Sequence, residues 1–232
     1  MNFTGLQKNS FIDYPEKISC VLFFSGCNFK CPYCHNPETV NSNLNNSALI
    51  NESMIYDFLK KRKGFLDGVV ISGGEPTLCK DLFLLCNNLK QMDFKVKLDT
   101  NGSKPIVIKT LIDEGLIDYI AMDIKTDPAN YSLLMPKGSK PNNILSSIKL
   151  IMKSKIDYEF RTTCVKPFID ENIIKNIAHI IQGSKLYALQ RFNENKVLDP
   201  EFFKDKDCGF NDIGLLNLQT IAKQWVKLCI IR

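Results

Sequence analysis

The segment Cys27-Asn28-Phe29-Lys30-Cys31-Pro32-Tyr33-Cys34 brings three cysteines into one short stretch of chain. The spacing C-x3-C-x2-C can supply three thiolate ligands to one metal cluster, and it leaves the fourth position without a cysteine. A four-iron cluster held at three corners keeps one iron open for a substrate or cofactor, whereas electron-carrying clusters normally use four cysteines. The spacing therefore predicts a catalytic iron–sulfur cluster on Cys27, Cys31 and Cys34.

The residues around this segment favour a loop that follows a β-strand. Residues 18–25 are rich in β-branched and aromatic side chains, which is typical of a strand. Gly26 then allows a sharp turn, and Pro32 stiffens the middle of the loop. Tyr33 and His35 flank the last cysteine, so we expect one of these rings to shield the cluster from water.

Two other chemistries fit three cysteines less well. A zinc site could take His35 as a fourth ligand, but structural zinc ligands usually arrive in two separated pairs, and no second pair is present. A disulfide framework is weaker still, because nine cysteines is an odd number in a chain without a signal peptide.

The longer string 26-GCNFKCPYCHNP-37, with 4-TGLQK-8 and 12-IDYP-15, resembles the radical S-adenosylmethionine (SAM) superfamily. Within it, the chain looks like the activating proteins of anaerobic ribonucleoside-triphosphate reductase, and the resemblance runs to about Asp199. It implies one [4Fe-4S] cluster, SAM as cofactor, and a flavodoxin- or ferredoxin-type electron donor. The remaining cysteines lack cluster spacing, which agrees with a single cluster.

Composition narrows the class of protein further. The chain has 232 residues, enough for one substantial core, and a mild net charge of +5 that does not indicate a nucleic-acid partner. No stretch approaches the roughly 18 apolar residues of a membrane span. We therefore expect a cytoplasmic protein, in which thiols stay reduced and available for iron, with no membrane partner.

Strand and helix signals alternate along the chain. Strands are predicted at 18–25, 68–72, 94–98, 117–124, 156–165 and 185–192, and helices at 52–62, 81–92, 105–114, 142–153, 171–181 and 213–225. Such alternation predicts an α/β fold with a parallel sheet covered by helices. The resemblance implies a partial (βα)6 TIM-like barrel of the radical SAM type. We expect a single core domain over 1–232, with a short N-terminal segment at 1–16 and a long loop near 193–212.

Gly73-Gly74-Glu75-Pro76 follows the second predicted strand. Two glycines let a small ligand approach the backbone, and the Glu75 carboxylate can accept hydrogen bonds from an ammonium group. Gly-Gly pairs are also ordinary turn material. The resemblance implies that Gly73, Gly74 and Glu75 hold the methionine amino group of SAM.

Two further polar motifs end the next strands. Asp99 and Thr100 follow the third predicted strand, and Asp123 and Lys125 follow the fourth. These types also occur in turns and helix caps. The resemblance implies that all four lie around the methionine carboxylate, one pair with a monovalent cation. A carboxylate ligand beside two aspartates would be repelled, so a cation or Lys125 is physically required.

Two residues on later strands complete the predicted pocket. Arg161 is a charge on a largely apolar strand and needs a partner, either the cofactor's carboxylate or ribose or a structural ion pair. Gln190 ends the sixth predicted strand. We predict no catalytic side chain beyond the cluster and cofactor, since radical chemistry requires no general base.

The resemblance implies an activase that reductively cleaves SAM and places a radical on a glycine of anaerobic ribonucleoside-triphosphate reductase, whose glycyl loop is the substrate. Three alternatives remain open. They are an activase of a pyruvate formate-lyase-type enzyme, a small-molecule enzyme resembling 7-carboxy-7-deazaguanine synthase, and a non-catalytic electron carrier. The Gly-Gly-Glu motif argues against the carrier, because a carrier needs no cofactor pocket.

Overall fold

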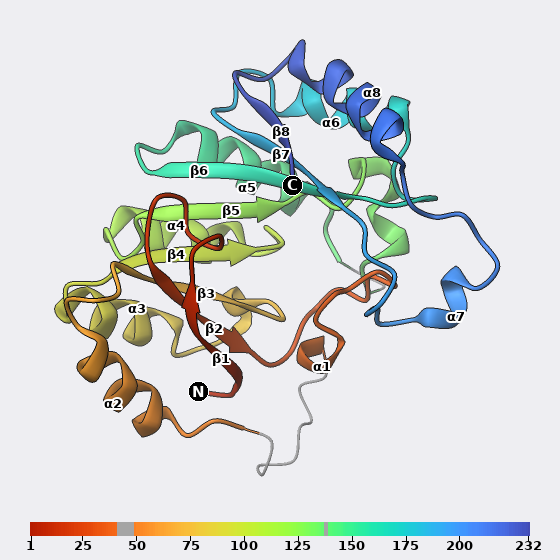
Figure 1. The fold of residues 1–232 in the computed structure, drawn as a ribbon. Coiled ribbons are helices and arrows are strands. Elements are labelled where there is room, and N and C mark those ends of the chain that lie inside the picture. The colour runs from red at the N-terminus through yellow and green to blue at the C-terminus, as the bar shows by residue number, and fades with distance from the viewer. Residues whose placement is uncertain (41–48, 137–138) are drawn as a thin grey trace. The chain divides into compact units, whose positions relative to one another are not determined.

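A computed structural model describes residues 1–40, 49–136 and 139–232, so most of the Asn/Ser-rich stretch 41–51 of the sequence lies outside the described residues. The described strands form an eight-stranded sheet, hydrogen-bonded in chain order (Figure 1). They are β1 (Phe3–Ser10), β2 (Ser19–Phe24), β3 (Gly68–Gly73), β4 (Lys95–Thr100), β5 (Tyr119–Asp123), β6 (Asp157–Cys164), β7 (Tyr187–Arg191) and β8 (Cys229–Ile231). β1 runs antiparallel to β2, whereas β2–β3–β4 and β6–β7–β8 are parallel.

Helices alternate with the strands, as the sequence predicts. They are α1 (Pro37–Val40), α2 (Glu52–Arg62), α3 (Leu82–Gln91), α4 (Pro105–Asp113), α5 (Asn142–Lys153), α6 (Glu171–Ile180), α7 (Pro200–Phe203) and α8 (Asp212–Lys223), with 3-10 turns η2 (Pro76–Leu78) and η3 (Pro128–Leu133). All six predicted helices and six predicted strands are present, and their ends agree with the predictions to within two residues, with 52–62 and 142–153 matching at both ends. Over the part of the chain that is described, no helix is long and apolar enough to cross a membrane.

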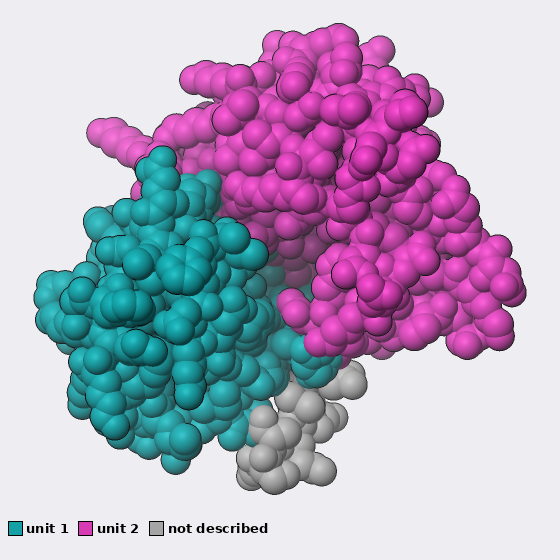
Figure 2. All heavy atoms as spheres, viewed as in Figure 1, with its two compact units in different colours: residues 1–28, 38–100, 106–120 teal, residues 29–37, 101–105, 121–232 magenta. Residues whose placement is uncertain are grey.

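Contacts divide the chain into two compact units, coloured separately in Figure 2. Unit 1 comprises Met1–Asn28, Glu38–Thr100 and Ile106–Ile120. Unit 2 comprises Phe29–Pro37, Asn101–Pro105 and Ala121–Arg232. Several of the predicted site residues belong to each unit.

The core of unit 1 is built on β2, β3 and β4. Val69, Val70 and Ile71 are fully buried in β3, which gives the continuous apolar run expected of a parallel strand covered on both faces. α3 packs on β4 through the buried face that includes Leu85 and Leu89. These contacts set the end of β3, where the Gly-Gly-Glu motif begins.

The core of unit 2 is built on β6, β7 and β8. Helices α6 and α8 contact each other, and α8 also contacts β7 and β8, as Figure 1 shows. α6 buries Ile174 and Ile177, and α8 buries Leu215 and Leu218, at the spacing of an amphipathic helix. The arrangement holds β6, which carries Arg161 near its middle, and β7, which carries Gln190 near its end.

Two helices and two strands of the described residues were not predicted from the sequence: the four-residue helices α1 and α7, and the strands β1 and β8. β1 lies within the expected N-terminal segment 1–16, α7 lies within the expected long loop 193–212, and β8 follows the last helix. β1 carries few apolar residues, and six of its eight residues are exposed or partly exposed, so it depends on its antiparallel pairing with β2 rather than on a strand-forming pattern. β8 and α7 are too short to give a periodic signal.

Asp118 holds the start of β4 in unit 1. Its carboxylate accepts hydrogen bonds from the Val96 amide (2.9 Å) and from the ammonium groups of Lys90 (2.8 Å) and Lys95 (3.0 Å). Burial alone would raise the pKa of Asp118, but these donors lower it below its ordinary value. The charged form is therefore favoured in the folded protein.

We expect Asp118→Asn to lower the free energy of unfolding at neutral pH by about 1 kcal/mol, a value kept small because the lysines are partly exposed. A lowered folded-state pKa contributes stability above the ordinary aspartate pKa near ~3.9, and this stability is lost as the pH falls through the folded value. Urea titrations should thus show a gap between the two proteins at pH 7 that closes at acidic pH. An unchanged gap would contradict the electrostatic origin.

Candidate cofactor site

The first cysteine of the loop is anchored in unit 1. Gly26 has φ +89°, a conformation that favours glycine, and its amide donates to the Thr39 carbonyl at 2.7 Å. The Cys27 amide donates to the Val40 carbonyl at 3.1 Å. The short helix α1 therefore fixes the backbone at which the cysteine loop starts.

The other two cysteines lie in unit 2, where the loop is held by its backbone. The Cys34 amide donates to the Cys31 carbonyl at 3.0 Å, which closes a turn between the two. Lys30 donates to the Leu134 carbonyl at 3.0 Å, and Asp199 donates its amide to the Pro32 carbonyl at 3.0 Å. The segment before α7 thus contacts the cysteine loop directly, which the sequence did not indicate.

The two rings predicted to flank the last cysteine have different surroundings. Tyr33 is buried, packs 5.3 Å from the Phe168 ring, and donates its hydroxyl to the Lys125 carbonyl at 3.3 Å. His35 is exposed and stacks on Phe192 at 6.1 Å. The part of the His35 ring that is covered by its neighbours loses hydration. This partial burial, and then the charge of Lys125, lower the pKa of His35, so its neutral form is favoured.

Several cysteines outside the loop have the properties of packing residues. The nine cysteines all lie among the described residues and form no disulfide, and burial raises the pKa of Cys20, Cys86 and Cys164 to about 12, so these three are protonated packing residues. Cys86 lies within α3, whereas Cys79 lies ahead of that helix, at the end of η2.

The loop cysteines have the donor chemistry that an iron–sulfur cluster requires. Among the described residues, no three His, Cys, Asp or Glu side chains are already grouped as a metal site, so the fit rests on the donors themselves. Burial would lower the pKa of Lys125, but Asp123 and then Cys31 and Cys34 raise it above its ordinary value. Lys125 therefore stays positively charged beside these two loop cysteines.

The predicted glycine pair shapes the end of β3. Gly73 has φ +111°, and a Cβ on Gly74 would lie 2.1 Å from the Gly26 carbonyl oxygen. The Glu75 amide donates to that same oxygen at 2.8 Å. The Gly-Gly-Glu motif therefore packs against the turn that precedes Cys27, and only glycine fits at position 74.

Glu75 joins two predicted motifs within unit 1. Its side chain is 1% exposed, and Oε1 accepts hydrogen bonds from the Thr77 amide (3.1 Å), the Thr77 hydroxyl and the Thr100 hydroxyl (2.8 Å). Glu75 thus caps η2 and also holds the end of β4. The structure therefore brings Glu75 and Thr100 together.

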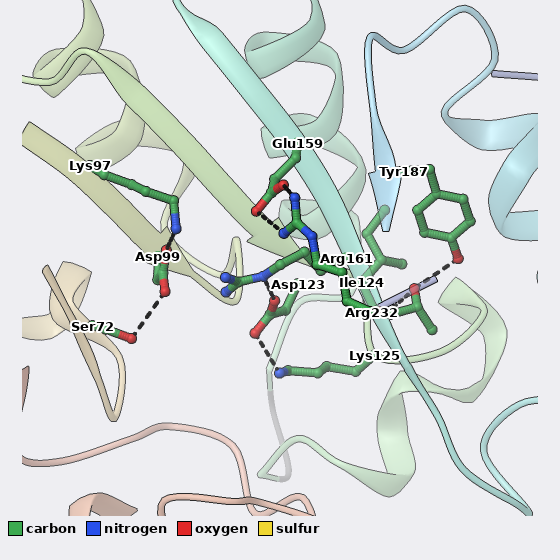
Figure 3. Close-up of polar contacts among 11 residues, drawn as sticks. Ser72, Lys97, Asp99, Asp123, Ile124, Lys125, Glu159, Arg161, Tyr187 and Arg232 are labelled. Carbon is green, nitrogen blue, oxygen red and sulfur yellow. Dashed lines mark hydrogen bonds and ion pairs between the residues drawn. The ribbon is translucent and has the colours of Figure 1, made fainter. Parts of the chain in front are cut away.

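Asp99 has a partner that the sequence analysis missed. The Lys97 ammonium lies 2.7 Å from Asp99 Oδ1, and the Ser72 hydroxyl donates to Oδ2 at 3.2 Å (Figure 3). The spacing of two residues on β4 places both side chains on one face of the strand. That register could have identified Lys97 from the string 95-KVKLDT-100.

Asp123, Lys125 and Arg161 form a single charged cluster in unit 2 (Figure 3). Asp123 accepts from Arg161 Nε at 2.7 Å and from Lys125 Nζ at 2.8 Å. Burial would raise the pKa of Asp123, but the two cations hold it well below its ordinary value. Of the two partners proposed for Arg161, the structure shows an ion pair. Gln190 lies opposite Thr163 on the neighbouring strand and is half-buried.

A second missed ion pair lies on the same strand as Arg161. Glu159 is 1% exposed, and its Oε2 lies 2.8 Å from Arg232 Nη2, as Figure 3 also shows. Glu159 and Arg161 are two residues apart and share one face of β6. Both charges on this face of β6 are therefore paired within the chain, Glu159 with Arg232 and Arg161 with Asp123.

Comparisons with known proteins agree with this chemistry. The family model described as "Radical SAM superfamily" matches residues 21–180. A Methanocaldococcus jannaschii protein named "Putative glycyl-radical enzyme activating enzyme" is 39% identical, over 99% of this chain and 95% of its own length. The "Pyruvate formate-lyase-activating enzyme" of Clostridium pasteurianum is 28% identical, over 76% of this chain and 77% of its own length.

A solved structure supports the fold alone. The crystal structure of Streptococcus suis SuiB bound to its precursor peptide SuiA superposes with a TM-score of 0.65 at 16% identity. The match covers 90% of this chain and 47% of that one, so this chain spans about half of SuiB. The predicted α/β fold, a partial barrel of the radical SAM type, is confirmed. The chain belongs to the radical SAM superfamily, for which a [4Fe-4S] cluster and SAM are the cofactors, and within it to the glycyl-radical enzyme activating enzymes.

Proposed function

We propose that this protein generates a glycyl radical on anaerobic ribonucleoside-triphosphate reductase. The observation that carries the proposal is the match over 99% of the chain to an activating enzyme, together with the string 26-GCNFKCPYCHNP-37. With a flavodoxin- or ferredoxin-type donor as the source of the electron, a cluster on Cys27, Cys31 and Cys34 would reduce SAM and supply the radical chemistry that removes a hydrogen atom from the glycine α-carbon. A single core domain, 1–232, would contain all of this chemistry.

In this proposal, each polar motif binds one part of the cofactors. Cys27, Cys31 and Cys34 hold three irons of a single cluster, with the buried ring of Tyr33 and the outer ring of His35 beside the loop. The other residues are assigned to the parts of SAM that they would bind. They are Gly73, Gly74 and Glu75 for the methionine amino group, Asp99, Thr100, Asp123 and Lys125 for the carboxylate, and Arg161 and Gln190 for the rest of SAM.

The charges of these residues support carboxylate binding. Asp123 is already paired with Lys125 and Arg161, so this cluster carries a net positive charge that would attract the carboxylate of SAM. Two aspartates without such partners would repel it. The negative charge of Asp99 can therefore be balanced in two ways, by a bound monovalent cation or by a cationic side chain of the protein.

The partner is tested by giving the enzyme two substrates in parallel. The cluster-loaded, reduced protein is mixed with SAM and either the anaerobic reductase or pyruvate formate-lyase, and the electron paramagnetic resonance spectrum is recorded. We expect a glycyl doublet with the reductase, absent when its radical glycine is replaced by alanine. A doublet with pyruvate formate-lyase alone would favour the second candidate, which the relative from Clostridium pasteurianum supports.

A further inference from the structure

Lys97 is a buried cation in unit 1 that the proposed function does not use. Its side chain is 1% exposed, whereas Lys95, two residues earlier on the same strand, is 54% exposed. An ammonium group loses several kcal/mol of hydration when it is buried, so it must be paired. The structure provides the partner, since Lys97 Nζ lies 2.7 Å from Asp99 Oδ1.

One tyrosine ring lies near the Lys97 ammonium, and a second tyrosine packs on that ring. Lys97 Nζ is 5.9 Å from the centroid of the Tyr119 ring, within the range of a cation–π interaction. The Tyr119 ring packs 5.8 Å from Tyr14, which is 3% exposed. Tyr14 belongs to the 12-IDYP-15 string, for which the sequence analysis found no role. We infer that Tyr14, by packing on Tyr119, helps to exclude water from the Lys97 ammonium and to keep it directed at Asp99.

Both Asp99 oxygens are engaged from within unit 1. Lys97 contacts Oδ1, and the Ser72 hydroxyl donates to Oδ2 at 3.2 Å. A metal cation coordinated by Oδ1 would have to share that oxygen with an ammonium group at hydrogen-bond distance, and the two positive charges would repel each other. The place of a bound cation beside Asp99 is therefore taken by the lysine.

We propose that Lys97 is the built-in counter-ion of Asp99, a positioning residue that lets the SAM carboxylate bind without a monovalent metal cation. The proposal rests on the proposed function, because it assigns Asp99 to the cofactor pocket. Lys97 acts through Asp99: it neutralises that carboxylate and holds its orientation. Its removal should create a dependence on cations that the natural protein lacks.

The test compares SAM binding in two salts, potassium chloride and tetramethylammonium chloride, whose organic cation is too large to coordinate a single carboxylate closely. Affinity is measured calorimetrically on the cluster-loaded protein. The natural protein and the exposed-site control Lys95→Met should bind SAM equally in both salts. Lys97→Met should bind at least about tenfold more weakly in tetramethylammonium, and potassium should restore part of the loss in a saturable way. Lys97→Arg should keep most of the affinity.

Two results would overturn the proposal. One is a saturable potassium requirement in the natural protein, and the other is unchanged SAM affinity in Lys97→Met. If Lys97→Met does not fold, the double variant Lys97→Met/Asp99→Asn removes both charges. It should bind SAM more weakly than the natural protein with no response to potassium, and a response to potassium would contradict the assignment.

A second readout separates this inference from the proposed function. In the cluster-free protein, potassium should raise the melting temperature of Lys97→Met relative to tetramethylammonium, while the natural protein shows no difference. If the cluster-loaded natural protein fails to bind SAM at all, the proposed function is wrong. The melting experiment still decides whether Lys97 replaces a cation, and equal shifts in both proteins would show that it does not.

Discussion

Replacing Cys31 by alanine is expected to abolish SAM cleavage. The three loop cysteines supply all the predicted protein ligands of the cluster, so removing one leaves an iron without its thiolate. Cys31 is also one of the two loop cysteines that raise the pKa of Lys125. Iron and sulfide content after anaerobic reconstitution, and 5′-deoxyadenosine formed per protein, should both fall to background.

The matched control is Cys79→Ala. Cys79 is also free and partly exposed, but it lies at the end of η2, and burial raises the pKa of its thiol. This variant should retain its iron and its turnover. A Cys31→Ala protein that still binds four irons and cleaves SAM would show that the loop is not the cluster site.

Gly74→Ala is expected to cause the second-largest loss. An added Cβ would lie 2.1 Å from the Gly26 carbonyl oxygen, 2.6 Å from its carbon and 2.9 Å from the Thr39 oxygen. These are backbone atoms, so the turn that precedes Cys27 must move. Overpacking of this kind costs about 1–3 kcal/mol, and here the displaced backbone carries the first cluster ligand. We expect lower iron content and a loss of SAM cleavage of at least about a hundredfold, as misplaced reacting groups produce.

Gly209→Ala serves as its control, because a Cβ there meets nothing within 4 Å and the backbone is not in the left-handed region. Thermal unfolding and iron content should match the natural protein. Full cluster occupancy and normal activity in Gly74→Ala would mean that the contact between the Gly-Gly-Glu motif and the cysteine loop is unimportant.

The regular part of the fold could be predicted because strand and helix periodicities repeat along the chain. The predicted helix 142–153 has the observed ends of α5, and β3 extends the predicted strand 68–72 by one residue. β1 could not be predicted, since its stability comes from pairing with β2 rather than from its own side chains. The same holds for β8, whose three residues form a strand only because β7 provides an edge.

The sequence can nominate candidate site residues but not the partners that hold them. Spacing and position on the strands made Glu75, Asp123 and Arg161 candidates, but a sequence does not state which charges meet. The structure pairs Arg161 with Asp123 and connects Glu75 to Thr100. Lys97 was missed because lysine is most often a surface residue, and only the fold shows that this one is buried.

The most direct test of the proposed reaction follows one hydrogen atom. The anaerobic reductase is prepared with glycine deuterated at the α-carbon and mixed with the reduced, cluster-loaded protein and SAM. The 5′-deoxyadenosine product is then analysed by mass spectrometry. Transfer from glycine predicts one deuterium in each product molecule, formed together with the glycyl radical. Product that contains no deuterium would contradict the claim that this protein activates the reductase by taking a hydrogen atom from its glycine.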